Sequence, residues 1–175
     1  MDRAEVPGMN REERLRRWID AYSDTILKTC YLYLSDQGQA EDATQDTWIK
    51  AWNHMEAYEC QQISNEKAWL LRIAINTCKD YKRTAWFRHI DRKKSLEELP
   101  PQLLTMEPRD ESLTLLVMDL PDRYKQVILL YYFQGLTMQE TAAALESSQA
   151  TVQRRLRKAE ALLKSSLTGG ETNEE

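Results

Sequence analysis

The sequence predicts an all-α protein composed of two small helical domains. Only five glycines and five prolines occur in 175 residues. Apolar residues recur at spacings of three and four, which is the period of an amphipathic helix. Three of the prolines fall within an acidic stretch at 95–111, where this periodicity stops. We therefore predict a domain at 11–88, an acidic linker at 89–112 and a second, helix-turn-helix domain at 113–167.

Charge is distributed unevenly along the chain. The segment 60–94 holds nine basic and three acidic residues, whereas 36–59 holds one basic and six acidic residues. The segment 95–122 holds one basic and seven acidic residues. Such segregation is expected when different surfaces meet different partners, although ordinary solvated faces also produce charge runs.

Several classes of protein are disfavoured by the composition. No window approaches 18 apolar residues and the N-terminus lacks a signal peptide, so we expect a cytoplasmic protein with no membrane insertion of its own. Three cysteines without CxxC spacing and two histidines predict no metal site, and we expect no cofactor. The sequence has no Gly-rich phosphate loop and no clustered catalytic motif, so we expect no enzyme activity.

The first domain begins with an apolar stripe from Leu15 to Leu34, which predicts a core helix. Residues 35–38 supply a turn, and a second helix is predicted at 39–55. One face of this helix carries Asp42, Gln45, Asp46, Ile49 and Asn53. That face is either plain solvent surface or a docking surface for a basic partner.

A polar loop is predicted at 57–65, followed by a helix at 66–84. Four side chains of this helix fall on one ridge: Arg72, Asn76, Lys79 and Arg83. Basic side chains can follow a phosphate backbone, and aromatic side chains can stack on unpaired bases. The neighbouring aromatic residues are Trp69, Tyr81, Trp86 and Phe87. The basic ridge and its aromatic neighbours predict binding of single-stranded nucleic acid. In the alternative interpretation the aromatic rings are buried in the core, and for Trp69 we favour burial.

The second domain shows the pattern of a helix-turn-helix. One helix is predicted from Asp122 to Gly135, and a short helix follows, with Thr137 and Glu140 forming a capping box. After Ser147 and Ser148 a final helix buries its apolar side. Its outer side predicts base contacts by Gln153, Arg154 and Arg157 and phosphate contacts by Arg155 and Lys158. A helical hairpin with a solvated basic side is the alternative.

Four segments, taken in order, resemble a known family. They are EDATQDTWIKAW (41–52), KAWLLRIAINTCKDYKR (67–83), LPDRYKQVILLYYFQGLTMQETA (120–142) and ATVQRRLRKA (150–159). Together they resemble a bacterial RNA polymerase sigma factor of the extracytoplasmic-function (ECF) group, over about residues 14 to 165. The second segment, joined to LPxxYKxV and TVxxRL, is the most specific part of the match.

The resemblance implies a non-enzymatic initiation factor that binds core RNA polymerase and promoter DNA. It implies polymerase contacts by the face of Asp42, Gln45, Asp46 and Ile49. It implies minus-ten contacts by the helix carrying Arg72, Asn76, Lys79, Asp80 and Arg83, with a flipped base held near the loop 61–66. It implies minus-thirty-five contacts within 151–158, namely by Thr151, Gln153, Arg154, Arg155, Arg157 and Lys158. It also implies an inhibitory anti-sigma factor as a partner.

The helix-turn-helix departs from the family pattern at four positions. Thr141 and Ser147 stand where aliphatic residues are usual, Glu146 stands where glycine is usual, and Glu160 replaces a frequent basic residue. Two other hypotheses compete with the sigma factor. A stand-alone dimeric helix-turn-helix regulator would need a dimer interface, and a nucleic-acid enzyme would need catalytic motifs.

Overall fold

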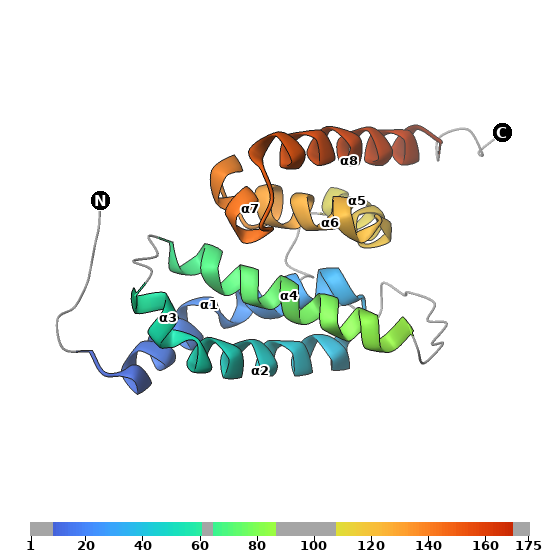
Figure 1. The fold of residues 1–175 in the computed structure, drawn as a ribbon. Helices are drawn as coiled ribbons and strands as arrows, with labels where there is room; N and C mark the ends of the chain where they lie inside the picture. Colours follow the sequence, from blue (N-terminus) through green and yellow to red (C-terminus); the bar gives the residue numbers. More distant parts are fainter. Residues whose placement is uncertain (1–8, 61–64, 87–107, 170–175) are drawn as a thin grey trace.

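The computed structural model describes residues 9–60, 65–86 and 108–169, and every regular element within these ranges is a helix. The all-α prediction is confirmed. The helices form one group within residues 11–86 and a second group within residues 108–169, and the two groups lie against each other (Figure 1). Residues 89–107 of the predicted linker lie outside the described residues.

The first group consists of α1 (Arg11–Leu34), α2 (Gln37–Asn53), α3 (Met55–Cys60) and α4 (Glu66–Trp86). Helix α1 packs against α2 and α4, which also pack against each other. Large apolar side chains with no exposed surface fill the space between them: Trp18, Ile26, Leu70, Leu71 and Ile75. Burial of each such side chain contributes about 1.5–3 kcal/mol, so this shared core holds the three long helices together.

Local capping explains where the first two long helices begin and end. Asn10 and Glu13 form a capping box at the start of α1. Ser35 ends α1 in the left-handed region with φ 58°, and the Asp36 carboxylate accepts a 2.7 Å hydrogen bond from the Gln39 backbone N–H to cap α2. The turn predicted at 35–38 is therefore confined to residues 35 and 36, because α2 begins two residues earlier than predicted.

The prediction of a loop over 57–65 is wrong in its first part, because α3 extends to Cys60. Met55 and Tyr58, three residues apart, both bury their side chains against the first-group core. This one-turn apolar face is too short to produce a recognisable periodicity in sequence. Residues 61–64 lie outside the described residues.

The second group consists of α5 (Pro108–Asp119), α6 (Asp122–Ile128), η2 (Leu129–Phe133), α7 (Met138–Ala144) and α8 (Gln149–Gly169). Helix α5 begins at Pro108, inside the stretch predicted as linker, with proline in the first turn, where its missing N–H costs nothing. Helix α8 packs against α5, α6 and α7.

The single helix predicted from Asp122 to Gly135 is divided into α6 and a π-helical turn, η2. The Gln134 backbone N–H donates to the Leu129 carbonyl over 2.9 Å, which is the wider spacing of a π turn. Gly135 ends the segment with φ 68°, as its position after the helix predicts. The π turn leaves Gln134 buried, facing the first group.

The predicted helix-turn-helix is present as α7, a turn and α8. The Thr137 side chain accepts from the Glu140 N–H, and the Glu140 carboxylate accepts from the Thr137 N–H over 2.8 Å, so the capping box is confirmed. The Thr137 and Asn65 hydrogen bonds hold the pKa of Glu140 below its usual value. Glu146 lies in the turn with φ 50°, a conformation that favours glycine.

Replacing Thr141 with valine is expected to stabilise the protein by about 1 kcal/mol. Thr141 is fully buried in α7, and its hydroxyl has no hydrogen-bond partner in the described part of the chain. Valine has the same shape without the buried polar group. Urea denaturation measures the change, and Thr47→Val is the matched control, because the buried Thr47 hydroxyl donates to the Ala43 carbonyl over 2.7 Å. Equal stabilisation by both substitutions would contradict the explanation.

The second group lies across α4 and one side of α1 (Figure 1). Helix α7 packs on α4, and α5 and α6 pack on α1. Helix α8 forms the layer farthest from α4 (Figure 1). The outer side of α8 therefore stays open while part of α4 is covered.

Candidate polymerase and nucleic-acid interfaces

The predicted docking face of α2 is mostly open to solvent. Asp42, Gln45 and Ile49 are exposed, and Ile49 has 59% of its surface accessible, although it is a large apolar side chain. Asp46 differs from them because it is half-buried and accepts a 2.7 Å hydrogen bond from the Tyr81 hydroxyl of α4. Burial and this hydrogen bond raise the pKa of Tyr81. Asp46 thus joins α2 to α4 within the first group.

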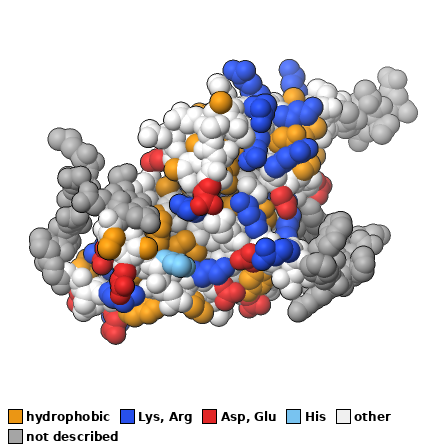
Figure 2. Space-filling model, viewed as in Figure 1, with side chains coloured by type: hydrophobic (Ala, Val, Ile, Leu, Met, Phe, Trp, Pro, Cys, Tyr) orange, Lys and Arg blue, Asp and Glu red, His pale blue; other side chains and the backbone are white. Residues whose placement is uncertain are grey.

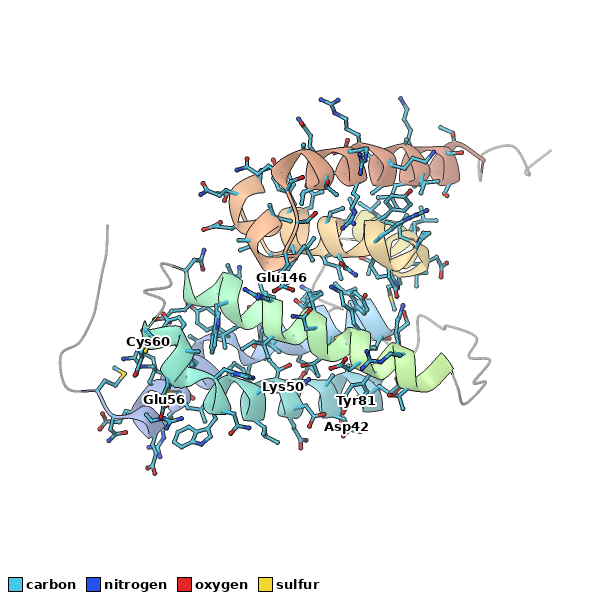
Figure 3. All side chains as sticks on the ribbon, viewed as in Figure 1. Asp42, Lys50, Glu56, Cys60, Tyr81 and Glu146 are labelled. Carbon is cyan, nitrogen blue, oxygen red and sulfur yellow. The ribbon has the colours of Figure 1, made fainter. Side chains whose placement is uncertain are left out.

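A second polar bridge between α2 and α4 involves the predicted DNA-contact residue Asp80. Its carboxylate accepts from Lys50 Nζ over 3.3 Å and from Arg83 Nη2 over 3.0 Å. Lys50 Nζ also donates to the Thr77 hydroxyl over 3.1 Å. Two cations therefore neutralise Asp80, so the carboxylate can lie in a basic region without repelling a phosphate strongly. Figure 3 shows Lys50 and Tyr81 between the two helices.

An open hollow of about 370 Å³ lies between α2, α3 and the N-terminal half of α4. Its lining combines two cationic side chains, an indole, a histidine and an amide: Lys50, Arg72, Trp69, His54 and Asn76, with Ala57 and Ile73. This set offers a stacking surface, positive charge and hydrogen-bonding groups, which are what an unpaired nucleotide requires. Sequence reasoning missed Lys50, which lies in the last turn of α2, and His54, which caps that helix; their spacing of four was the available signal.

Trp69 both lines this hollow and belongs to an aromatic cluster. Its ring centroid lies 5.4 Å from that of Trp18 and 4.9 Å from that of Tyr58, and Trp18 lies 5.1 Å from Tyr58. The Trp18 indole N–H donates to Glu66 over 2.9 Å, which ties α1 to the start of α4. Trp69 is half-buried, so the prediction that its ring is buried is only partly correct. The side chain of Trp86 and residue Phe87 lie outside the described residues.

The four residues of the predicted α4 ridge face different surroundings. Asn76 lines the hollow, and Arg83 is exposed. Arg72 forms an ion pair with Glu146 in the helix-turn-helix turn. Lys79 is half-buried, and burial lowers its pKa, although the charges of Glu146 and Asp122 act in the opposite direction. The ridge is therefore partly covered by the second group.

The outer side of α8 carries the predicted duplex-contact residues. Gln153, Arg154, Arg157 and Lys158 are exposed, whereas Thr151 and Arg155 are half-buried. The Ser148 hydroxyl accepts from the Thr151 backbone N–H over 3.2 Å and donates to the Thr151 hydroxyl over 3.0 Å, which assigns Thr151 to the start of the helix. Figure 2 shows Lys and Arg side chains gathered over α8.

The fold and these surfaces define a helical DNA-binding protein of the helix-turn-helix class. The Sigma-70 region 2 model matches residues 18–88, and the Sigma-70, region 4 model matches residues 110–163. The chain belongs to the sigma-70 family of RNA polymerase sigma factors, and its relatives are of the ECF type. It is therefore a transcription initiation factor.

The chain is similar to curated sigma factors over most of their length. It is 28% identical over 159 residues to the RNA polymerase sigma-E factor of Streptomyces coelicolor, covering 86% of this chain and 84% of the relative. It is 27% identical over 166 residues to the ECF RNA polymerase sigma factor SigW of Bacillus subtilis, covering 85% of this chain and 86% of the relative.

Two solved structures share the fold. The sigma factor RpoE of Bartonella quintana, in complex with the anti-sigma factor NepR, matches with a TM-score of 0.74 and 21% identity, covering 93% of this chain and 99% of that chain. CnrH, in complex with the cytosolic domain of CnrY, matches with a TM-score of 0.69 and 19% identity, covering 91% of this chain and 90% of that chain. None of the helices in the described ranges is long and apolar enough to span a bilayer.

Proposed function

We propose that this chain binds core RNA polymerase through α2 and directs it to specific promoters in the cytoplasm. The observation that carries the proposal is the presence of both sigma regions, in order, in one chain. The exposed face of Asp42, Gln45 and Ile49 supplies negative charge around an apolar side chain, which suits a basic partner surface. Asp46 supports this face from within the first group.

In this proposal the domain at 11–88 captures the minus-ten element as a single strand. The hollow lined by Trp69, Arg72 and Asn76 receives an unstacked base, and Lys79 and Arg83 lie along the path of the strand. Unstacking a base costs a few kcal/mol. A binding factor without its own energy source offsets that cost with the free energy of polymerase docking and base capture, so no catalytic residue is required.

The domain at 113–167 reads the minus-thirty-five element through α8, and the stretch 89–112, whose last residues begin α5, links the two domains. The N-terminal half of a recognition helix contacts base edges in the major groove. Exposed Gln153, Arg154 and Arg157 have the side-chain types that read adenine and guanine there, and Arg155 and Lys158 suit phosphates. Thr151 fixes the start of this helix through Ser148.

An anti-sigma factor completes the proposed set of partners. One structure with the same fold contains the sigma factor RpoE bound to the anti-sigma factor NepR, and another contains CnrH bound to the cytosolic domain of CnrY. The face of Asp42, Gln45 and Ile49 on α2 and the outer side of α8 are exposed, so both are open to such a partner. Affinity capture from cells, with and without inducing conditions, tests for this partner; recovery of polymerase subunits alone under both conditions contradicts it.

Size-exclusion chromatography with sigma-free core RNA polymerase tests the main proposal. Co-elution of the chain with core polymerase is the expected result. If the chain instead elutes apart from polymerase and binds duplex DNA as a dimer, the proposed function is wrong.

Replacing Arg154 with alanine is expected to weaken minus-thirty-five binding by about 1–3 kcal/mol, as for loss of a bidentate base contact. The measurement uses duplexes selected from a random pool by the chain bound to core polymerase. The base preference at one position should relax as well. Lys164→Ala is the matched control, because Lys164 is exposed on the same helix, nearer its C-terminus, and its loss changes the charge equally. Equal losses for both variants would mean that Arg154 contributes charge without reading a base.

A further inference from the structure

We propose that the second group of helices holds the free chain in a self-inhibited state, with Glu146 occupying on Arg72 the position of a DNA phosphate. This inference rests on the proposed function, because it assigns the covered side of α4 to promoter DNA. The two groups contact each other through a set of buried hydrogen bonds, here called the seam, and through charged contacts around it. All of these contacts form within the one chain, without a second protein.

The seam consists of hydrogen bonds between α1 and the second group. Gln126 Nε2 donates to the Tyr33 hydroxyl over 3.0 Å, and Gln134 Nε2 donates to the Thr29 hydroxyl over 3.0 Å. All four residues are buried. Lys125, which is 2% exposed, places its Nζ 3.4 Å from the Tyr33 carbonyl oxygen.

Buried polar groups are costly unless their hydrogen bonds are made. Here the two amide hydrogen bonds join a side chain of the first group to a side chain of the second. They are satisfied only when the two groups pack in this arrangement. A contact between two unrelated surfaces would not be expected to bury two amides with complementary hydroxyls. The seam therefore indicates a defined closed state.

Charged contacts surround the seam, and in each ion pair the cation comes from α4. Arg72 pairs with Glu146, and Lys82 pairs with Asp122 over 2.5 Å. Lys67 Nζ donates to the Gln134 carbonyl over 2.7 Å. A carboxylate and a phosphate are both anionic oxygen acceptors for arginine, and both can bind the same guanidinium. Arg72 also lines the hollow, so its ion pair lies at the edge of the proposed base-binding site.

Glu146 stands at the turn position where the family pattern usually has glycine. Its backbone lies at φ 50°, in the left-handed region that non-glycine residues adopt only at a cost. Figure 3 shows its side chain between α7 and α4. The turn therefore tolerates backbone strain at the one residue whose carboxylate reaches Arg72.

The closed state is incompatible with simultaneous recognition of both promoter elements. The minus-ten and minus-thirty-five elements are about 25 base pairs apart, or roughly 80 Å along the duplex. Packed helices lie about 8–10 Å apart, so α8, one layer beyond α7, is too close to α4 to span that distance. The groups must separate before the chain can bind a promoter. In the closed state α8 remains exposed, and Arg72 and Lys79 on the ridge of α4 are partly covered.

Small-angle X-ray scattering of the free chain, together with binding to a fluorescein-labelled single-stranded DNA of mixed sequence, tests the proposal. The wild-type chain is expected to be compact, near the radius of gyration of about 16 Å typical of its length. Thr29→Val removes the acceptor for Gln134, and Glu146→Gln removes the carboxylate from Arg72. The double variant is expected to have a larger radius of gyration and to bind the single strand about tenfold more tightly.

Two further variants distinguish the effect of opening the closed state from an effect of net charge and from an effect of impaired folding. Glu160→Gln changes the net charge by the same amount as Glu146→Gln. Glu160 accepts a hydrogen bond from the Tyr132 hydroxyl within the second group, so this variant is expected to behave as wild type. Glu146→Gly removes the carboxylate and relieves the left-handed strain, so it is expected to fold at least as well as wild type and to bind the single strand more tightly. Circular dichroism monitors folding in every case.

The possible failures are distinct. A wild-type chain that is already expanded, or opened variants with unchanged size and DNA affinity, would overturn self-inhibition. A compact chain that opens in the variants but never co-elutes with core polymerase would support closure and overturn the proposed function. Equal gains for Glu160→Gln and Glu146→Gln would assign the effect to net charge and would also overturn the proposal.

Discussion

Replacing Trp18 with alanine is expected to destabilise the protein by about 3–5 kcal/mol. Trp18 has no exposed surface and lies against the rings of Tyr58 and Trp69. Its loss leaves a large cavity between α1, α3 and α4 and removes the indole hydrogen bond to Glu66. Since small domains have a total stability of about 5–15 kcal/mol, the first group should be partly unfolded at room temperature. Urea denaturation followed by far-UV circular dichroism measures the change.

Trp18→Phe is the control for this prediction. Phenylalanine keeps an aromatic ring in the cluster but cannot donate to Glu66, so a smaller loss of about 1–2 kcal/mol is expected. Because neither variant can donate to Glu66, the difference between them measures the ring packing alone. A Trp18→Ala protein within about 1 kcal/mol of wild type would show that the cluster is not the central support of the first group.

The position of this cluster connects stability with the proposed DNA site. Trp69 packs on Trp18 with one part of its ring and lines the hollow with another. Glu66 accepts from both Trp18 and Arg17, which fixes the start of α4, and the first two turns of this helix carry Trp69 and Arg72 of the hollow. The core therefore determines the shape of the surface that would receive an unstacked base.

Features set by local sequence were predicted well. The capping box at Thr137 and Glu140 and the helix end at Gly135 both depend on residues a few positions apart. Their hydrogen bonds form within one turn of chain, so the pattern of residue types suffices to locate them. The exposed face of α2 likewise followed from the helical period, except at Asp46.

Features set by contacts between distant segments were not predicted. Helical periodicity placed Arg72 and Lys79 on one ridge, but it carries no information about what covers that ridge. The Arg72 contact with Glu146 joins residues 74 positions apart, and the Tyr81 contact with Asp46 joins residues 35 positions apart. The short helix α3 and the π turn η2 also depend on the core against which they pack. Tertiary structure therefore decided which predicted site residues are accessible.

Reversing the charge at Asp42 is expected to weaken binding to core polymerase by about 3 kcal/mol, or roughly 100-fold. Asp42 is exposed and forms none of the α2–α4 contacts that Asp46 makes, so Asp42→Arg should leave the fold intact. The arginine would place a positive charge opposite a basic partner surface. Fluorescence anisotropy of the labelled chain, titrated with core polymerase at fixed salt, measures the affinity.

Glu41→Arg is the matched control for Asp42→Arg. Glu41 is exposed, precedes Asp42 on the same helix and changes the net charge equally, but it lies about 100° away around the helix axis. If the face of Asp42, Gln45 and Ile49 docks on polymerase, the loss should be much larger for Asp42→Arg than for Glu41→Arg. Equal losses would mean that polymerase senses only the overall charge of α2. Unchanged affinity in both variants would move the docking surface away from this helix.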